Sequence, residues 1–504
     1  MVLGRTLAVS LVGLTGHLVD VEAHLAPSLP AFTLVGLPDA SLSEARDRVR
    51  AAVTSSGLPW PNRRITVNLS PATLPKSGSS FDLAIAVATL AGAELLTAPA
   101  GVVHIGELAL DGRLRPVRGV LPAVAAAVAA GRPRVVVPVA NLAEAQLVPG
   151  ALAVGASSLA QVAARYGAEV DVPDTTDPVV VEHPRAVAPV LDLADVVGQA
   201  EARQCLEVAA AGGHHLLMVG PPGTGKTMLA ARLPGLLPDL VEADAVEVTA
   251  VHSVAGTFDP GDGLLVRPPF EDPHHTATPA SVVGGGSGIP RPGAASRAHR
   301  GVLFLDEAPE FSTAVLQTLR QPLEHGELVL HRAQGAARYP ARFQLVLAAN
   351  PCPCGKAVGK GLDCTCRSEQ RRRYFGKLSG PLLDRVDLQV ELVPARAGDE
   401  AGDATSVVAG RVRVARGAAA DRLRGTPWRT GAEVPGGWLR ERLGADGSLL
   451  HDLDRALDRG TLSLRGVDRV LRVARTLADL DGRAAPTRGD IGNALLLRTR
   501  GQGA

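Results

Sequence analysis

The sequence predicts an α/β protein with a parallel sheet at its centre and a helical C-terminal part, and three observations support this. A strand-like apolar run at 216–219 leads into a glycine-rich loop and then a helix. A second apolar run at 302–305 ends in two carboxylates. Elsewhere, short strand-like runs alternate with alanine-rich helical segments, as in parallel sheets that are covered by helices.

The glycine-rich loop has the spacing Gly-x-x-x-x-Gly-Lys-Thr. In its strand–loop–helix setting, the backbone N–H groups of such a loop surround phosphates, and the helix N-terminus adds its dipole. Lys226 supplies a positive charge for the β- and γ-phosphates, and Thr227 supplies a hydroxyl for Mg²⁺. We therefore predict that ATP or GTP binds to Gly220, Pro221, Pro222, Gly223, Thr224, Gly225, Lys226 and Thr227.

The carboxylates after the second apolar run complete the predicted hydrolytic site. Asp306 is expected to hold Mg²⁺, directly or through water, and Glu307 to polarise the attacking water. An apolar run followed by Asp-Glu is a weak signal alone, but it is strong downstream of a good phosphate loop.

Composition limits the other functions that the chain can have. The 504 residues carry a net charge of +1, so any nucleic-acid surface must be local. No apolar run is long enough for a membrane span, and the N-terminus lacks a convincing leader, so we expect a cytoplasmic protein. Four of the five cysteines crowd into fifteen residues, which is not a secreted disulfide pattern.

The chain divides into four predicted parts. Residues 1–167 form an α/β domain, with strands expected at 7–12, 32–36, 64–69 and 135–138, and helices at 41–56, 82–93 and 120–130. A proline- and acid-rich linker spans 168–190. The ATPase core then covers 191–394, and a helical lid domain covers 395–504, with an amphipathic helix at 462–480.

Segments 68–72, 74–83 and 106–117 resemble the protease domain of Lon, which has a ribosomal S5 domain 2-like α/β fold. In Lon a serine–lysine dyad cleaves peptides, and the serine falls on Ser80. The lysine is expected shortly after Pro116, but this chain has Arg118 there and no lysine between Lys76 and Lys226. Because arginine cannot act as a neutral base, we predict the Lon-like fold without peptidase activity.

Three further residues match positions of the AAA+ ATPases, a resemblance that implies their roles. Asn350, at the tip of a predicted strand at 343–350, matches the sensor that orients the lytic water. Arg385, in 379–387, matches the arginine finger that reaches the γ-phosphate of a neighbouring subunit. Arg465 matches the second sensor in the lid. The alternatives are a surface ion pair of Arg385 with Asp384 or Asp387, and an ordinary surface arginine at 465.

Two segments between the motifs are candidates for substrate contacts. The run 270–288 is rich in glycine and proline, which predicts a flexible insertion. Its His274 and His275 are either metal ligands or, as we favour, substrate contacts or hydrogen-bonding residues. Segment 327–342 predicts a hairpin around Gly335 that carries Arg332 and Arg338.

The four crowded cysteines form two Cys-x-Cys pairs. Four thiolates can hold a structural zinc ion, and the alternative is unligated or redox-active thiols. The candidate ligands are Cys352, Cys354, Cys364 and Cys366. The arginines and aromatic residues that follow at 367–377 suit either phosphate and base contacts or a solvated helix face.

Over nearly its full length the chain resembles the YifB/ComM group of magnesium-chelatase-like AAA+ proteins. Its matching segments include 212–215, 273–276, 350–355, 379–387 and 463–480. The resemblance implies a hexameric ring that uses ATP and Mg²⁺ to move along branched or single-stranded DNA during recombination or natural transformation. The hairpin and the insertion would then line the pore. The alternative is a remodelling ATPase that acts on proteins, similar to MoxR proteins or the small magnesium-chelatase subunit.

Overall fold

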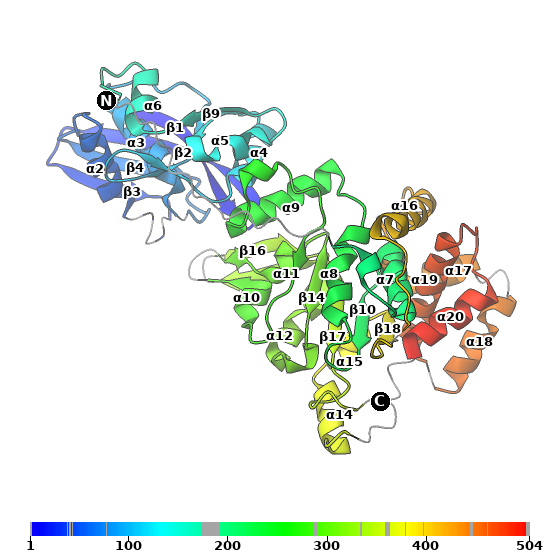
Figure 1. Cartoon of the computed structure of the whole chain (residues 1–504). Coiled ribbons are helices and arrows are strands. Elements are labelled where there is room, and N and C mark those ends of the chain that lie inside the picture. The colour runs from blue at the N-terminus through cyan, green and yellow to red at the C-terminus, as the bar shows by residue number, and fades with distance from the viewer. Residues whose placement is uncertain are drawn as a thin grey trace.

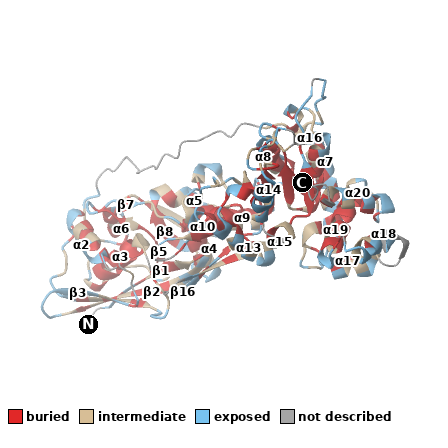
Figure 2. Ribbon diagram, turned by 90° about the horizontal axis from the view of Figure 1, so that it is seen from below, coloured by how far each residue is buried: buried red, intermediate tan, exposed pale blue. Residues whose placement is uncertain are grey.

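The computed structural model describes residues 3–37, 39, 42, 44–76, 78–172, 191–286, 290–332, 335–357, 363–378, 380–396, 398–443, 447–460 and 462–499. A sheet near the N-terminus, a second sheet and a group of C-terminal helices follow one another along an elongated molecule (Figure 1). Buried residues form cores inside each of these parts (Figure 2). Among the described residues, no helix combines the length and apolar character that a membrane span requires.

The N-terminal part contains a mixed seven-stranded sheet in the order β3-β4-β2-β1-β5-β8-β9. Its strands are β1 (Leu3–Val12), β2 (Thr15–Ala26), β3 (Ala31–Val35), β4 (Arg64–Ser70), β5 (Val103–His104), β8 (Arg134–Pro138) and β9 (Leu152–Ala156). A short separate pair is made of β6 (Glu107–Leu108) and β7 (Leu114–Arg115). The helices are α2 (Ala45–Ser55), α3 (Asp82–Gly92), α4 (Val120–Ala129), α5 (Leu142–Gln146) and α6 (Leu159–Arg165).

The strands expected in this part are confirmed, but β2, β5 and β9 of the same sheet were not predicted. β2 pairs antiparallel with β1 over its length. Val19, Val21, Ala23 and Leu25 are buried while the residues between them are more exposed, because alternate side chains of a strand point to opposite faces. The alternation of apolar and polar residues at 19–25 is itself a strand signal that the sequence carries.

The central sheet is parallel throughout, as the sequence predicts. Its order is β11 (Phe270–Glu271), β14 (Val302–Leu305), β17 (Gln344–Ala349), β10 (Leu216–Val219) and β18 (Leu388–Glu391). β14, β17 and β10 are wholly buried, which explains their uninterrupted apolar sequences. The associated helices are α7 (Ala200–Gly212), α8 (Lys226–Leu236), α9 (Glu242–Ala255), α11 (Ala294–Arg297), α12 (Thr313–Thr318) and α13 (Arg320–His325).

The structure corrects two expectations in this region. Segment 270–288 is not simply a flexible insertion, because Phe270–Glu271 is the edge strand of the core sheet. The segment continues with α10 (Pro279–Val283) and β12 (Gly284–Gly285), which pairs with β13 (Arg291–Pro292), while 287–289 lie outside the described residues. After the Asp306–Glu307 pair, the apolar positions at 316, 319 and 323 predict one helix over 314–324, but the structure divides it at Leu319 into α12 and α13. The predicted hairpin is confirmed as β15 (Glu327–Arg332) and β16 (Gly335–Pro340).

The C-terminal helices pack around α19 (Leu464–Leu480). The amphipathic helix expected at 462–480 is confirmed, and the apolar residues at helical spacing along it are buried: Val467, Val470, Leu471, Ala474, Leu477 and Ala478. Their spacing places them on one side of the helix, against α7, α16, α17 and α20. The remaining helices are α14 (Ser368–Gly376), α15 (Gly380–Leu383), α16 (Thr405–Arg422), α17 (Gly436–Leu443), α18 (Gly447–Asp458) and α20 (Arg488–Thr499).

The N-terminal part is attached to the core through α9 and the β15–β16 hairpin. Ser253 Oγ of α9 donates a 2.5 Å hydrogen bond to the buried carboxylate of Glu144. Ala250 belongs to the same apolar cluster as α4 and β8. At Gly13, between β1 and β2, a Cβ atom would come within 2.4 Å of the Arg338 carbonyl oxygen, so the two backbones are in direct contact.

We predict that the buried pair between Arg48 and Asp82 stabilises the N-terminal part. Arg48 of α2 donates to both carboxylate oxygens of Asp82, at 2.7 and 3.0 Å, and Asp82 is fully buried. Arg48→Ala should lower the free energy of unfolding by about 3 kcal/mol, because it leaves a buried carboxylate unpaired. Arg46→Ala, on the exposed side of the same helix, should cost less than about 0.5 kcal/mol. Equal losses in denaturant melts would contradict this assignment.

Candidate nucleotide-binding site

The phosphate-loop residues lie between β10 and α8, at the carboxyl edge of the central sheet. The loop depends on glycine at three places. Gly223 and Gly225 have φ values of +79° and +89°, a conformation that favours glycine. At Gly220, a Cβ atom would come within 2.8 Å of the Leu392 carbonyl oxygen, so the loop leaves the sheet where only glycine fits. Pro221, Pro222 and Thr224 lie between these glycines.

Lys226 begins α8, and its side chain turns back under the loop. The Nζ atom donates to the carbonyl oxygens of Gly220 and Pro221 at 2.6 and 3.0 Å, and to Asn350 Oδ1 at 3.1 Å. Burial lowers the pKa of Lys226, although the charges of Asp306 and Glu307 oppose this effect. The ammonium group therefore joins the phosphate loop to the tip of β17, where Asn350 lies.

The two predicted magnesium ligands are in contact. Thr227 Oγ1 donates a 2.8 Å hydrogen bond to Asp306 Oδ2, across the space between α8 and the end of β14. A hydroxyl and a carboxylate are oxygen donors of the kind that Mg²⁺ prefers. The donor set and its place beside the phosphate loop thus fit Mg²⁺.

Glu307 lies next to Asp306 in an unusual conformation. Its φ is +50°, and its N–H donates to Asp306 Oδ1 at 2.9 Å. His275 Nδ1 lies 3.4 Å from Glu307 Oε2, and the His274 ring packs on the His275 ring with centroids 4.1 Å apart. The predicted catalytic carboxylate is thus in contact with the loop that follows edge strand β11.

Sequence reasoning missed this contact and also the position of Gln199. Gln199 Nε2 donates to the carbonyl oxygens of Thr224, in the phosphate loop, and Val393, after β18. The backbone of Gln199 is left-handed, with a φ of +53°, which is uncommon for a residue other than glycine. The sequence does not reveal this conformation, so it gave no local signal of the contact.

Arg385 lies at the amino end of the sheet strands, opposite the end that carries the phosphate loop. Asp387, two residues later, donates its N–H to the carbonyl of His215, which precedes β10, so this segment lies at the amino end of both strands. Among the residues that the structure describes, Arg385 forms its ion pair with Glu324 of α13, whereas the alternative expected Asp384 or Asp387. Burial lowers the pKa of Arg385, and so do three neighbouring arginines: Arg469, Arg465 and Arg320.

Arg465 belongs to the same cluster of arginines. It is one helical turn before Arg469, whose guanidinium is 2.9 Å from the buried Asp387 carboxylate. Burial alone would raise the pKa of Asp387, but the hydrogen bond from His214 and the charge of Arg469 bring it below its usual range. β10 has four residues, so about 13 Å of strand separates this arginine cluster from the phosphate loop of the same chain.

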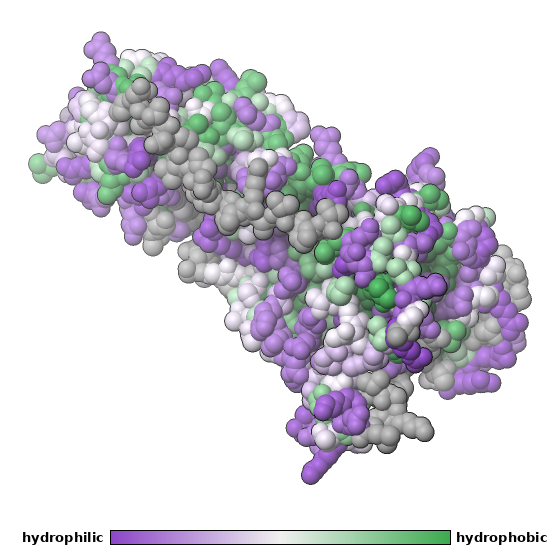
Figure 3. Space-filling view, in the orientation of Figure 1, coloured by the Kyte–Doolittle hydropathy of each residue, from purple (hydrophilic) through white to green (hydrophobic). Residues whose placement is uncertain are grey.

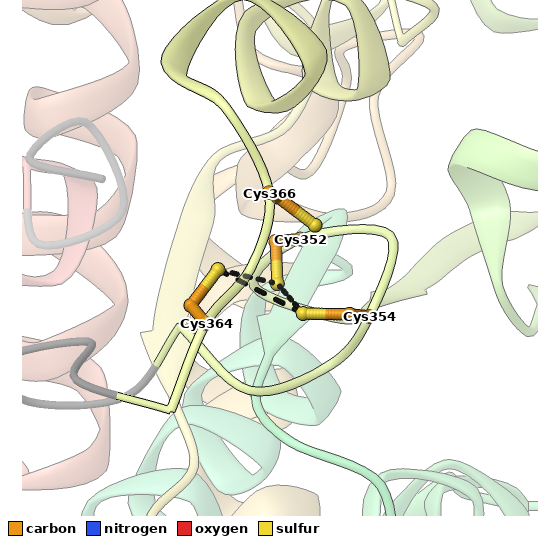
Figure 4. A group of neighbouring side chains, drawn as sticks. All are labelled: Cys352, Cys354, Cys364 and Cys366. Atoms are coloured by element: carbon orange, nitrogen blue, oxygen red, sulfur yellow. Dashed lines mark hydrogen bonds between the residues drawn. The ribbon is translucent and has the colours of Figure 1, made fainter.

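The four cysteines of the two Cys-x-Cys pairs come together beside the carboxyl edge of the sheet (Figure 4). The Sγ–Sγ distances are 3.3 Å for Cys352–Cys354, 3.7 Å for Cys354–Cys364 and 3.6 Å for Cys364–Cys352. Together with Cys366, the four sulfur atoms lie within 4.8 Å of one another. We call this group the cysteine cluster.

The remaining candidates lie on the hairpin, in the insertion and in the N-terminal part. Arg338 of β16 is exposed and pairs with Glu327 at 2.9 Å. Arg332 ends β15, and its side chain lies outside the described residues. His274 is exposed and bonds to Thr276. In the N-terminal part, the carbonyl oxygen of Ser80 accepts a hydrogen bond from the Gly106 N–H. Arg118 packs against Gly256, which follows α9, because a Cβ atom on Gly256 would come within 2.5 Å of Arg118 Nε.

Family models match the N-terminal part, the core and the C-terminal helices of this chain. The family model described as magnesium chelatase, subunit ChlI, matches residues 192–400. Two further models, subunit ChlI of Mg-chelatase and magnesium chelatase, subunit ChlI C-terminal, match residues 21–141 and 402–498.

Three relatives match almost end to end. An uncharacterized protein of Mycobacterium tuberculosis is 53% identical over 99% of both chains. The uncharacterized protein YifB of Escherichia coli is 41% identical, covering 96% of this chain and 95% of its own. The competence protein ComM of Haemophilus influenzae is 41% identical, covering 93% and 92%. The chain belongs to the magnesium-chelatase-like YifB/ComM family. This membership, with the mixed α/β fold and its parallel sheet, supports an AAA+-type ATPase role for this YifB/ComM protein.

We predict that His275 orients Glu307 in this YifB/ComM family member. His275→Ala should lower kcat for ATP hydrolysis by roughly threefold to tenfold, because the carboxylate loses a neighbour 3.4 Å away, while nucleotide affinity stays unchanged. Steady-state hydrolysis and fluorescent-nucleotide titration separate the two quantities. The matched control is His17→Ala on β2, which should alter neither. An unchanged kcat in His275→Ala would show that the contact has no catalytic consequence.

Proposed function

We propose that the chain is an ATP-hydrolysing AAA+ motor that assembles into a homo-oligomeric ring, a hexamer, and moves along DNA to promote branch migration in recombination or natural transformation. One observation carries the proposal. The groups predicted to bind and hydrolyse ATP lie at the carboxyl edge of the central sheet, while the arginines expected to act on ATP lie at its amino edge. A complete catalytic site thus requires two subunits.

Within the proposed site, each residue has one task. The loop N–H groups and Lys226 hold the phosphates, and Thr227 and Asp306 hold Mg²⁺, which neutralises charge on the β- and γ-phosphates when bound. Glu307 accepts a proton from the attacking water, and Asn350, fixed by its bond to Lys226, orients that water. The Glu307 backbone has a φ of +50°, and its side chain lies beside His275.

The arginine cluster is proposed to complete the site of a neighbouring subunit. A guanidinium group that approaches the γ-phosphate stabilises charge that develops during phosphoryl transfer. Arg385 and Arg465 lie together at one edge, so a single neighbour would receive both. The ion pair between Arg385 and Glu324 would then be exchanged for the pair with phosphate.

We also propose DNA contacts and the organisation of the remaining parts. The exposed Arg338 of the hairpin, with Arg332, His274 and His275, would face DNA in the ring pore.

The N-terminal part, 1–167, would be a Lon-like domain without a dyad, followed by the linker at 168–190, the core at 191–394 and the lid at 395–504. The cysteine cluster would hold structural Zn²⁺, and the ring would work in the cytoplasm.

A remodelling ATPase that acts on protein partners is the second candidate. The matches to models named for magnesium chelatase subunits favour it, because those models cover the core and the C-terminal helices. DNA dependence of hydrolysis distinguishes the two candidates.

The first test is ATP hydrolysis by the purified chain alone and with single-stranded, duplex, forked and four-way-junction DNA at two salt concentrations. We expect branched DNA to stimulate the rate by roughly fivefold or more, and high salt to reduce this stimulation, because phosphate contacts release counterions. Arg338→Ala should reduce the stimulation, whereas Arg424→Ala, an exposed arginine after α16, should not. Turnover that ignores every DNA would favour the remodelling ATPase.

A second test asks whether the arginines act between subunits. Lys226→Ala should abolish nucleotide binding, and Arg385→Ala should bind nucleotide but hydrolyse it slowly. Mixing the two inactive variants should restore hydrolysis, with a maximum near equal amounts, because some neighbouring pairs then combine an intact loop with an intact arginine. Mixtures of Lys226→Ala with Glu307→Gln serve as the control, since both lesions lie at the same edge and no neighbouring pair is complete.

A further inference from the structure

The spacing of the sulfur atoms in the cysteine cluster suits a tetrahedral metal ion. Four thiolates about 2.3 Å from a zinc ion lie about 3.8 Å from one another. The Sγ–Sγ distances of 3.3–3.7 Å are close to this value and far from the roughly 2.05 Å of a disulfide. A closed set of four protein ligands is typical of structural zinc, because it leaves no open position for a substrate.

The first Cys-x-Cys pair is tied to the predicted sensor of the nucleotide site. Cys352 is fully buried and comes two residues after Asn350, at the end of β17. Asn350 in turn accepts a hydrogen bond from the Lys226 ammonium. A ligand at Cys352 therefore fixes the chain immediately beyond the residue that touches Lys226.

The same pair also lies directly against the phosphate loop. Gly355 follows Cys354 and has a φ of +74°, and a Cβ atom there would come within 2.7 Å of Pro222 Cδ. Because Gly355 has no side chain, its backbone lies directly against Pro222. A displacement of residues 352–355 would therefore also displace Pro222.

The second Cys-x-Cys pair leads into α14, which contacts the segment after Glu307. Tyr374 of α14 is buried and interacts with the Asn350 backbone. Lys377, which follows α14, lies 3.7 Å from Glu310 in the turn after Glu307. α14 projects from the core as a tip whose visible surface is largely hydrophilic (Figure 3).

We propose that the cysteine cluster binds one zinc ion and that this zinc-bound loop braces the nucleotide site, so that zinc loading sets the affinity for ATP. The zinc ion would crosslink the end of β17 to the start of α14. The segment after β17 contacts the phosphate loop, and α14 with Lys377 contacts Asn350 and the turn after Glu307. This inference rests on the proposed ATP site but not on DNA movement or on a ring.

The test measures zinc and nucleotide affinity in the full chain. The purified protein should contain about one zinc ion per chain by mass spectrometry of the metal. Cys364→Ser should lose that zinc and weaken the binding of a fluorescent ATP analogue by about tenfold or more. The matched control is Cys205→Ala, which removes the buried lone cysteine of α7 and should retain both zinc and affinity.

A second measurement does not depend on how the variant folds. Stripping zinc from the wild-type chain with a zinc-selective chelator in excess Mg²⁺ should lower ATP affinity, and added zinc should restore it. Wild-type protein without zinc would overturn the site, and zinc loss with unchanged ATP affinity would overturn the brace. Zinc-dependent ATP affinity without any response to DNA would instead leave the brace standing and contradict the proposed DNA motor.

Discussion

The Lys226 ammonium is the contact on which the rest of the site depends. It lies among loop carbonyls and the Asn350 amide oxygen, so it holds the ends of β10 and β17 together. That arrangement is available only because β10 and β17 are neighbours in the parallel sheet and β14 is the next strand. The strand order brings the phosphate loop, Asn350 and the Asp306–Glu307 pair to one edge, since the carboxyl ends of parallel strands coincide.

The same strand direction separates the arginines from the phosphate loop. Asp387 precedes β18, so Arg385 is fixed at the amino edge, and the pair between Asp387 and Arg469 brings the start of α19 to that edge as well. Asp387 is fully buried, and both His214 and Arg469 contact its carboxylate. This junction between the core and the C-terminal helices is therefore costly to break, because breaking it would leave a buried charge unpaired. In the proposed ring, this rigid junction delivers Arg385 and Arg465 together, so the lid is as much a part of the neighbour's site as of its own subunit.

The sequence was informative wherever a local pattern determines the structure. The phosphate loop, the β15–β16 hairpin and the apolar face of α19 are each contained in one continuous segment, and all three are present. Edge strand β11 could not be recognised, because two residues carry no periodicity and prolines lie on both sides of them, at 268, 269 and 273. The contacts of His275 with Glu307 and of Gln199 with the phosphate loop join segments that only the folded chain brings together.

The attachment of the N-terminal part follows from the same core. Its contacts reach α9 and β16, which both extend from the central sheet, and include the Glu144–Ser253 hydrogen bond and the packing of Gly13 on Arg338. Arg118, at the position where a Lon-type lysine is expected, packs against Gly256 at the end of α9. A residue that cannot serve as a catalytic base therefore contributes to holding the two parts together. Because β16 belongs to the hairpin proposed to face DNA, a shift of that hairpin would be transmitted directly to the β1–β2 turn.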